Sequence, residues 1–199
     1  TVFSRVPRGD GGAVSVTGPQ SVRPAAPIVV EPDPRWPAIY AAEARAIAHA
    51  LQERVVSVHH IGSTAIPGIC AKPVIDILLE TRDVAALDGV AAGMHGLGYE
   101  GLGEYGIPRR RYFRKGALHG ARGCHVHAYA TGDPHVIRHL AFRDYMRAHP
   151  DVAAEYDALK RRLSAGHPAD KTAYVDGKAP YVAAWQALAL EWAGRIEAR

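Results

Sequence analysis

Two apolar segments joined by a short connection constrain the fold of this chain more than any other feature. Residues 55–61 (VVSVHHI) are rich in β-branched side chains and end at Gly62, so they predict a β-strand. Residues 73–79 (PVIDILL) are almost continuously apolar, which predicts a second strand with both faces covered. The connection, residues 62–72 (GSTAIPGICAK), predicts a loop or a short helical turn.

The remaining patterns predict a small mixed sheet followed by a helical C-terminal third, an α+β fold. Residues 1–27 are rich in Gly, Pro and Ser without a sustained period and predict a flexible tail, so residues 28–199 form a single domain. Asp33 and Asp83 stand where they can cap the helices that follow. Further strands are predicted at residues 28–31, 110–115 and 123–130, and helices at residues 36–51, 84–96, 134–148, 151–165 and 169–197.

Length and composition exclude several classes of protein. The chain has 199 residues, which suits one domain, and its hydrophobic content of 48% excludes wholesale disorder. No apolar run approaches the roughly 20 residues that cross a bilayer, so we expect a soluble protein without a membrane partner. Cys70 and Cys124 are too far apart for a CxxC knuckle and suggest a reducing compartment, the cytoplasm. The net charge of +4 favours anionic partners.

The connection and the second strand carry residues suited to phosphate chemistry. Gly62 lets the backbone approach a ligand closely, and the small hydroxyl side chains of Ser63 and Thr64 can help to cradle a phosphate. Asp76 is the only charged residue of the apolar segment, where an ionised carboxylate is costly unless it is paired, exposed at a cleft or bound to a cation. A structural role, in which Asp76 caps neighbouring backbone, is the alternative.

Basic side chains able to neutralise a phosphate recur along the chain. Residues 109–115 (RRRYFRK) hold five positive charges, and the last predicted helix carries two lysines and a tyrosine on one face. A solvated basic surface is the alternative for each of them. Phosphate contacts are predicted from Lys72, Arg110, Arg111, Lys171, Tyr174 and Lys178.

A histidine pair lies on the last predicted strand. His125 and His127 alternate with Val126, so both imidazoles project from one face, as in a metal-ligand pair. Contact with a phosphate or substrate, or a place in the core, is the alternative.

These motifs resemble known families. A Gly–Ser pair, a spacer and an aspartate resemble the signature of the nucleotidyltransferase fold, which implies that the loop holds nucleotide phosphates and that carboxylates hold Mg²⁺. The segments HIGSTAIPGICAKPVIDI, GEYGIPRRRYFRK, HVH and RHLAFRDYMRAHPDVAAEYDALK are similar to the GrpB (UPF0157) family over about residues 28–196. That family is placed in the nucleotidyltransferase-like superfamily by fold, and some members are fused to dephospho-CoA kinase.

The resemblance also assigns the candidate site residues. Leu78 stands where the nucleotidyltransferase signature has its second carboxylate, and Glu104 is our candidate for a partial replacement. In that fold a later strand supplies a third carboxylate, which by analogy places His125 and His127 beside Asp76. These three are the predicted metal ligands, and their donor set favours Zn²⁺, Fe²⁺ or Mn²⁺ over Mg²⁺. The predicted catalytic residues are Asp76, Glu104 and His127.

Three functions remain open at this point. The first is transfer of a nucleotidyl group, or ATP-dependent activation of a small acid, with Mg²⁺ or Mn²⁺ (Zn²⁺ as the alternative) and ATP or another nucleoside triphosphate. The second is a non-catalytic module that binds a nucleotide or CoA-type phosphate ligand. The third is a metalloenzyme that uses the His/Asp site without nucleotides. Nucleic acid is an unfavoured partner because the basic run has only Tyr112 and Phe113 for stacking.

Overall fold

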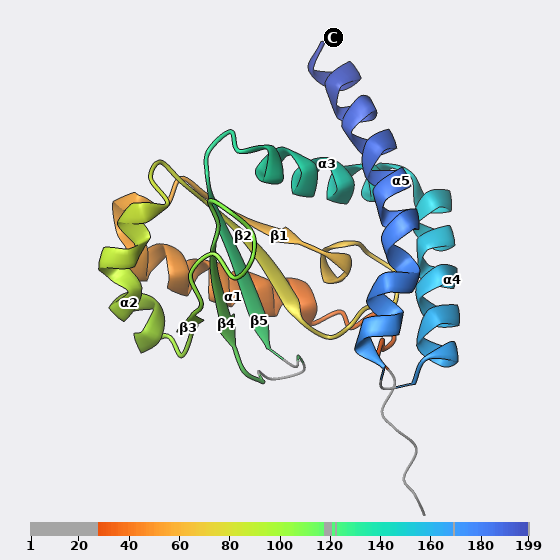
Figure 1. Ribbon diagram of the computed structural model, residues 1–199, viewed down its shortest axis with the longest axis horizontal. Helices are drawn as coiled ribbons and strands as arrows, with labels where there is room; N and C mark the ends of the chain where they lie inside the picture. The colour runs from red at the N-terminus through yellow and green to blue at the C-terminus, as the bar shows by residue number, and fades with distance from the viewer. Residues whose placement is uncertain (1–27, 118–120, 122, 169, 199) are drawn as a thin grey trace, which may run out of the picture.

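The computed structural model describes residues 28–117, 121, 123–168 and 170–198 (Figure 1). The predicted flexible tail, residues 1–27, lies outside this part of the chain. The described part contains a five-stranded sheet in the order β1-β2-β5-β4-β3, in which β2 and β5 are parallel and the other neighbours are antiparallel. The strands are β1 (Ser57–Ile61), β2 (Ile75–Thr81), β3 (Glu100–Gly101), β4 (Arg111–Lys115) and β5 (Cys124–Ala130).

One face of the sheet is covered by α1 (Trp36–Leu51) and α2 (Ala91–Gly96). Alternate residues of the two central strands point into this layer and are fully buried, as a period of two requires. The core they form with the helices contains Ile75, Ile77 and Leu79 of β2, Cys124, Val126 and Ala128 of β5, and Trp36, Ile47, Leu51 and Met94 of the two helices.

The opposite face is covered by α3 (Pro134–Ala148), with α4 (Pro150–Gly166) and α5 (Lys171–Glu197) beside it (Figure 1). The carboxylate of Asp133 accepts the amide of His135 and caps α3. A small second core joins Leu78 of β2 to Val136 of α3. The predicted α+β class, with a mixed sheet and a helical C-terminal third, is therefore confirmed.

The region between β2 and β4 departs from the prediction. The helix expected over residues 84–96 is a 3₁₀-helix, η3 (Ala85–Val90), followed by the short α2. Asp83 does accept the amide of Ala85. The residues after α2, expected to be a loop, include the two-residue edge strand β3, which is too short for a periodic pattern to reveal.

The N-terminal segment of the domain also differs. The strand predicted at residues 28–31 is a single bridge between Val30 and Ala71, because Pro32 and Pro34 interrupt the chain directly afterwards. Asp33 accepts the amide of Arg35 rather than capping α1, whose N-cap is Arg35 itself. None of the described helices is both long enough and apolar enough to span a membrane.

Candidate functional site

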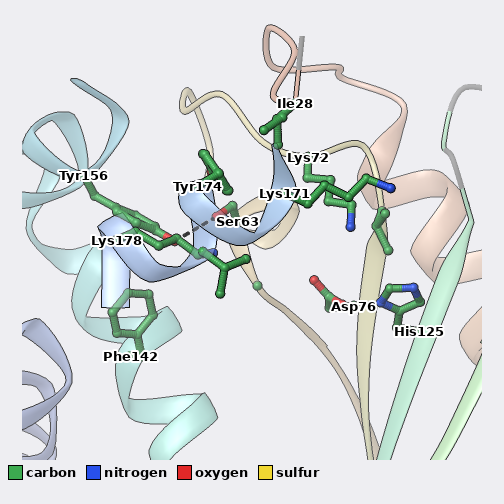
Figure 2. A pocket seen from close by; sticks show the side chains of 13 residues that line it. Ile28, Ser63, Lys72, Asp76, His125, Phe142, Tyr156, Lys171, Tyr174 and Lys178 are labelled. Atoms are coloured by element: carbon green, nitrogen blue, oxygen red, sulfur yellow. Dashed lines mark hydrogen bonds and ion pairs between the residues drawn. The ribbon is translucent and has the colours of Figure 1, made fainter. Parts of the chain in front are cut away.

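A cleft with a volume of about 250 Å³ opens where β2, β5 and the connection before β2 face the start of α5 (Figure 2). Side chains far apart in the sequence meet in it, because the parallel pair β2–β5 places Asp76 directly opposite His125. The structure brings eight of the predicted site residues to this cleft: Gly62, Ser63, Lys72, Asp76, His125, Lys171, Tyr174 and Lys178.

The Gly–Ser turn forms the floor of the cleft next to the Asp76 carboxylate. Gly62 has φ +71°, and a Cβ added there would lie 2.6 Å from Oδ2 of Asp76, so both the backbone angle and the space require glycine. The following residues form the 3₁₀-turn η2 (Ser63–Ala65). The Ser63 hydroxyl lies 3.4 Å from the Tyr156 hydroxyl, to which it donates (Figure 2).

Asp76 is held as a carboxylate. Its Oδ1 lies 3.5 Å from Nδ1 of His125 and 3.7 Å from Nε2 of His127. Burial alone raises the pKa of the Asp76 carboxyl, but the contacts with these two imidazoles outweigh it and hold the pKa well below the usual range. The side chain stays 31% exposed, and Oδ2 lies on the side of Gly62.

Arg110 determines which nitrogen of His127 carries the proton. This arginine is 5% exposed, donates to the carbonyls of Glu104 and Tyr105, and lies with Nη1 3.4 Å from Nδ1 of His127. A guanidinium cannot accept a hydrogen bond, so Nδ1 accepts and the proton resides on Nε2, facing Asp76. Arg110 therefore orients the His127 ring through this hydrogen bond, and it does not line the cleft.

This arrangement does not suit His127 as a metal ligand. A ligating histidine offers one nitrogen lone pair to the metal and donates its other N–H to an acceptor, the reverse of what Arg110 imposes. Within the described residues, no group of three or more His, Cys, Asp or Glu side chains is arranged to hold a metal ion. Asp76 offers the type of oxygen ligand that Mg²⁺ or Mn²⁺ would use, since magnesium commonly binds through one or two carboxylates together with the phosphates of its substrate.

Three other predicted site residues lie away from the cleft: Thr64, Arg111 and Glu104. Thr64 is buried, donates to the Val74 carbonyl and contacts Nε2 of His60 at 3.0 Å. Arg111 projects to the face opposite Asp76 and pairs with Asp88 at 2.6 Å.

Glu104 is exposed in the loop before β4, and its carboxylate accepts the amide of Arg109, which has φ +64°. It shapes this loop, so the structure does not place it as the carboxylate that Leu78 lacks.

Two aromatic residues of the cleft were not anticipated. Tyr156 of α4 and Phe142 of α3 pack edge to face, with ring centroids 5.8 Å apart. Beneath Tyr156 lies Lys160, only 1% exposed, with Nζ 4.5 Å from the ring centroid and donating to the Cys70 carbonyl. Burial lowers the pKa of Lys160 to about 8. No sequence pattern specifies which helix faces meet here.

The fold and the cleft together define a class of protein: an α+β domain in which a Gly–Ser turn, a strand aspartate and a lysine-bearing helix surround one site. Comparison with known proteins identifies the family, since the model of the GrpB protein family matches residues 26–187. The chain belongs to the GrpB family.

Similar proteins support this assignment. The crystal structure of the conserved protein GrpB from Enterococcus faecalis is 37% identical, with a TM-score of 0.77 over 82% of this chain and 98% of that one. The UPF0157 protein YqkA of Bacillus subtilis is 40% identical over 158 residues, 79% of this chain but 46% of YqkA. A dephospho-CoA kinase of Mycolicibacterium paratuberculosis is 32% identical over 83% of this chain and 46% of its own length. The chain thus spans about half the length of these two relatives.

Proposed function

We propose that the cleft binds the phosphates of a nucleoside triphosphate and that the protein transfers the nucleotidyl group to a small-molecule acceptor. One observation carries this proposal: three lysines and a Gly–Ser turn converge on the same cleft as a single ionised aspartate. A polyphosphate needs cationic and N–H donors along its length, and its bound metal needs an anionic oxygen.

The lysines would bind the phosphates. Lys171 and Lys178 are separated by about two turns of α5, or roughly 10 Å along its axis, so they can neutralise charges at both ends of a triphosphate. Lys72 approaches from the connection before β2 (Figure 2). The ring of Tyr174 lies 5.4 Å from Nζ of Lys178 and orients that side chain.

Asp76 would hold the divalent metal through its carboxylate. When bound, Mg²⁺ or Mn²⁺ supplies neutralisation of the charge on the transferring phosphoryl group. His125 is the group in the cleft best placed to take the proton of the acceptor. Its Nδ1 faces the Asp76 carboxylate, which leaves Nε2 as the basic nitrogen, as in an Asp–His pair.

A binding module without catalysis is the second candidate, and Leu78 favours it. Leu78 is fully buried where the nucleotidyltransferase signature has its second carboxylate. The relative named dephospho-CoA kinase makes dephospho-CoA a ligand to include in the same tests.

Calorimetry and pyrophosphate release test the proposal together. We expect a triphosphate to bind in the presence of Mn²⁺. The Lys178→Met substitution should lower its affinity about tenfold, since a charge-assisted contact contributes about 1.5 kcal/mol. Asp76→Asn should retain most phosphate affinity without metal and lose metal-dependent pyrophosphate release with a pool of small acceptors. The matched control is Arg111→Met, which removes a cation from the opposite face. Binding without release would establish the module, and no binding at millimolar triphosphate would refute both candidates.

A further inference from the structure

A second, larger cavity lies on the other side of η2. Its volume is about 630 Å³, against about 250 Å³ for the cleft, and the two share no lining residue. The turn separates them, because Gly62 and Ser63 line the cleft whereas Thr64 and Ala65 line the second cavity. This volume is in the range of sites for drug-sized ligands.

The walls of this cavity are flat and held in place. The rings of Tyr40 and His60 stack with centroids 4.6 Å apart and planes 7° from parallel. The Tyr40 hydroxyl donates to the Val58 carbonyl at 2.8 Å, and His60 contacts Thr64, so neither ring is free to turn. Trp36, 3% exposed, supplies a third ring. The prolines Pro32, Pro34, Pro37 and Pro67 complete an apolar lining without backbone N–H groups.

The charge of the cavity is positive. Arg147 donates Nε and Nη2 to the Ala65 carbonyl at 2.9 and 2.7 Å, which fixes its guanidinium at the cavity wall. Its Nη1 lies 3.8 Å from Asp144, a carboxylate that Arg143 binds more closely, at 2.7 and 2.9 Å. Two guanidiniums thus share one carboxylate. The acidic residue of the lining, Asp33, is paired with Arg35 at 2.6 Å.

His60 adds no charge to the cavity at neutral pH. Burial is the largest cause that lowers its pKa to about 4, and the nearby Arg147 lowers it further. The imidazole is therefore neutral and acts as a flat apolar surface.

We propose that this cavity binds a planar aromatic anion, a ring that carries one carboxylate or phosphate group, with the ring against the aromatic and proline lining and the anion on Nη1 of Arg147. This site goes beyond the proposed function, because it would exist even if the cleft bound no nucleotide. The same chemistry has two sources, an aromatic acid or a nucleoside monophosphate.

Amide chemical-shift mapping and calorimetry with defined probes test this proposal. We expect 2-naphthoate or AMP to bind with a Kd below about 1 mM and to shift amides of Tyr40, Ala65 and Gly68. Cyclohexanecarboxylate, which is not planar, and 2-naphthalenemethanol, which is not charged, should bind at least tenfold more weakly. Binding of AMP alone would identify a nucleotide site, and binding of 2-naphthoate alone an aromatic-acid site.

Variants separate this cavity from the cleft. Arg147→Met should lower the affinity for 2-naphthoate at least tenfold, and Arg147→Lys should lower it less. Lys178→Met and Asp76→Asn, both in the cleft, should leave the affinity for 2-naphthoate unchanged. Thermal melts check that the Arg147 variants fold, and the shift map of the unaltered chain decides the question if they do not. Three results would overturn the proposal. The first is equal binding of the charged and uncharged probes, and the second is no binding of either anion at 5 mM (about −3 kcal/mol or weaker). The third is a set of chemical-shift changes confined to the residues of the cleft.

Discussion

The two faces of the strand pair β2–β5 differ in almost every property although they are built from alternate residues of the same strands. On one face Ile77 and Val126 are fully buried against α1 and α2. On the other face Asp76 and His125 stay about one third exposed and line the cleft. A shift of one residue in register would exchange the two sets, so the register that closes the core also assembles the site.

Each face also contains side chains whose character is typical of the opposite face. Leu78 lies on the face of Asp76 but is buried in a small core with Ile61, Tyr129 and Val136. His60 of β1 is ionisable but pairs in register with Ile77 and is 7% exposed. These exceptions make the comparison testable.

The largest effect is expected from Leu78→Asp, which would restore the missing carboxylate of the nucleotidyltransferase signature. Because Leu78 is fully buried among apolar side chains, an unpaired charge there should lower the free energy of unfolding by more than about 4 kcal/mol. Urea unfolding measures this, with Leu78→Met as a control that costs less than about 1.5 kcal/mol. A stable Leu78→Asp protein would show that the polar face tolerates a second carboxylate.

On the apolar face, Ile77→Ala should lower the free energy of unfolding by about 3–4 kcal/mol through the cavity it leaves. The nucleotide affinity that we propose for the cleft, measured by calorimetry well below the melting temperature, should be unchanged, since Ile77 points away from the cleft. A parallel loss of affinity would mean that the two faces are coupled.

The buried His60 predicts a loss of stability in acid. Its pKa of about 4 in the folded chain lies below the ordinary 6.5, so as the pH falls the unfolded chain takes up the proton first. The stability that the neutral His60 contributes is fully present above pH 6.5 and is lost as the pH falls from 6.5 to 4, a loss of about 3 kcal/mol. Denaturant titrations of the unaltered chain and of His60→Gln should differ in this pH window, and identical slopes would refute the assignment.

The smallest effect is expected from Arg111→Met. The pair with Asp88 lies at the surface, with Asp88 59% exposed, so its loss should cost less than about 1 kcal/mol in urea unfolding. A larger cost would indicate that this pair fixes η3 against the sheet.

Much of the difference between the two faces could be predicted from the sequence. Alternation in the HVH segment placed both imidazoles on one face, and the i, i+3, i+7 spacing of Lys171, Tyr174 and Lys178 placed them on one side of α5. Those patterns report local periodicity, which the fold preserves. The Gly–Ser turn was equally readable, because its backbone demands glycine at position 62.

What could not be predicted depends on contacts between distant elements. The sequence offers Arg110 and Arg111 as equivalent cations, yet one is buried behind His127 and the other faces Asp88. Likewise, Thr64 follows Ser63 directly but turns to the Val74 carbonyl instead of the cleft. Side-chain direction in a turn follows from its tertiary partners, which no spacing rule encodes.

Gly177 is a position at which a substitution can change how α5 packs on α4 beside the cleft. It lies on α5 between Tyr174 and Lys178, and a Cβ added there would come within 2.7 Å of Cδ2 of Leu163. Because Cδ2 is the free end of a flexible side chain, a small residue at position 177 would be accommodated by a change in the Leu163 rotamer, and a larger one only by a shift of α5 against α4. Residues of increasing size at position 177 therefore form a graded series, by which the packing of α5 on α4 can be varied without altering any residue that lines the cleft.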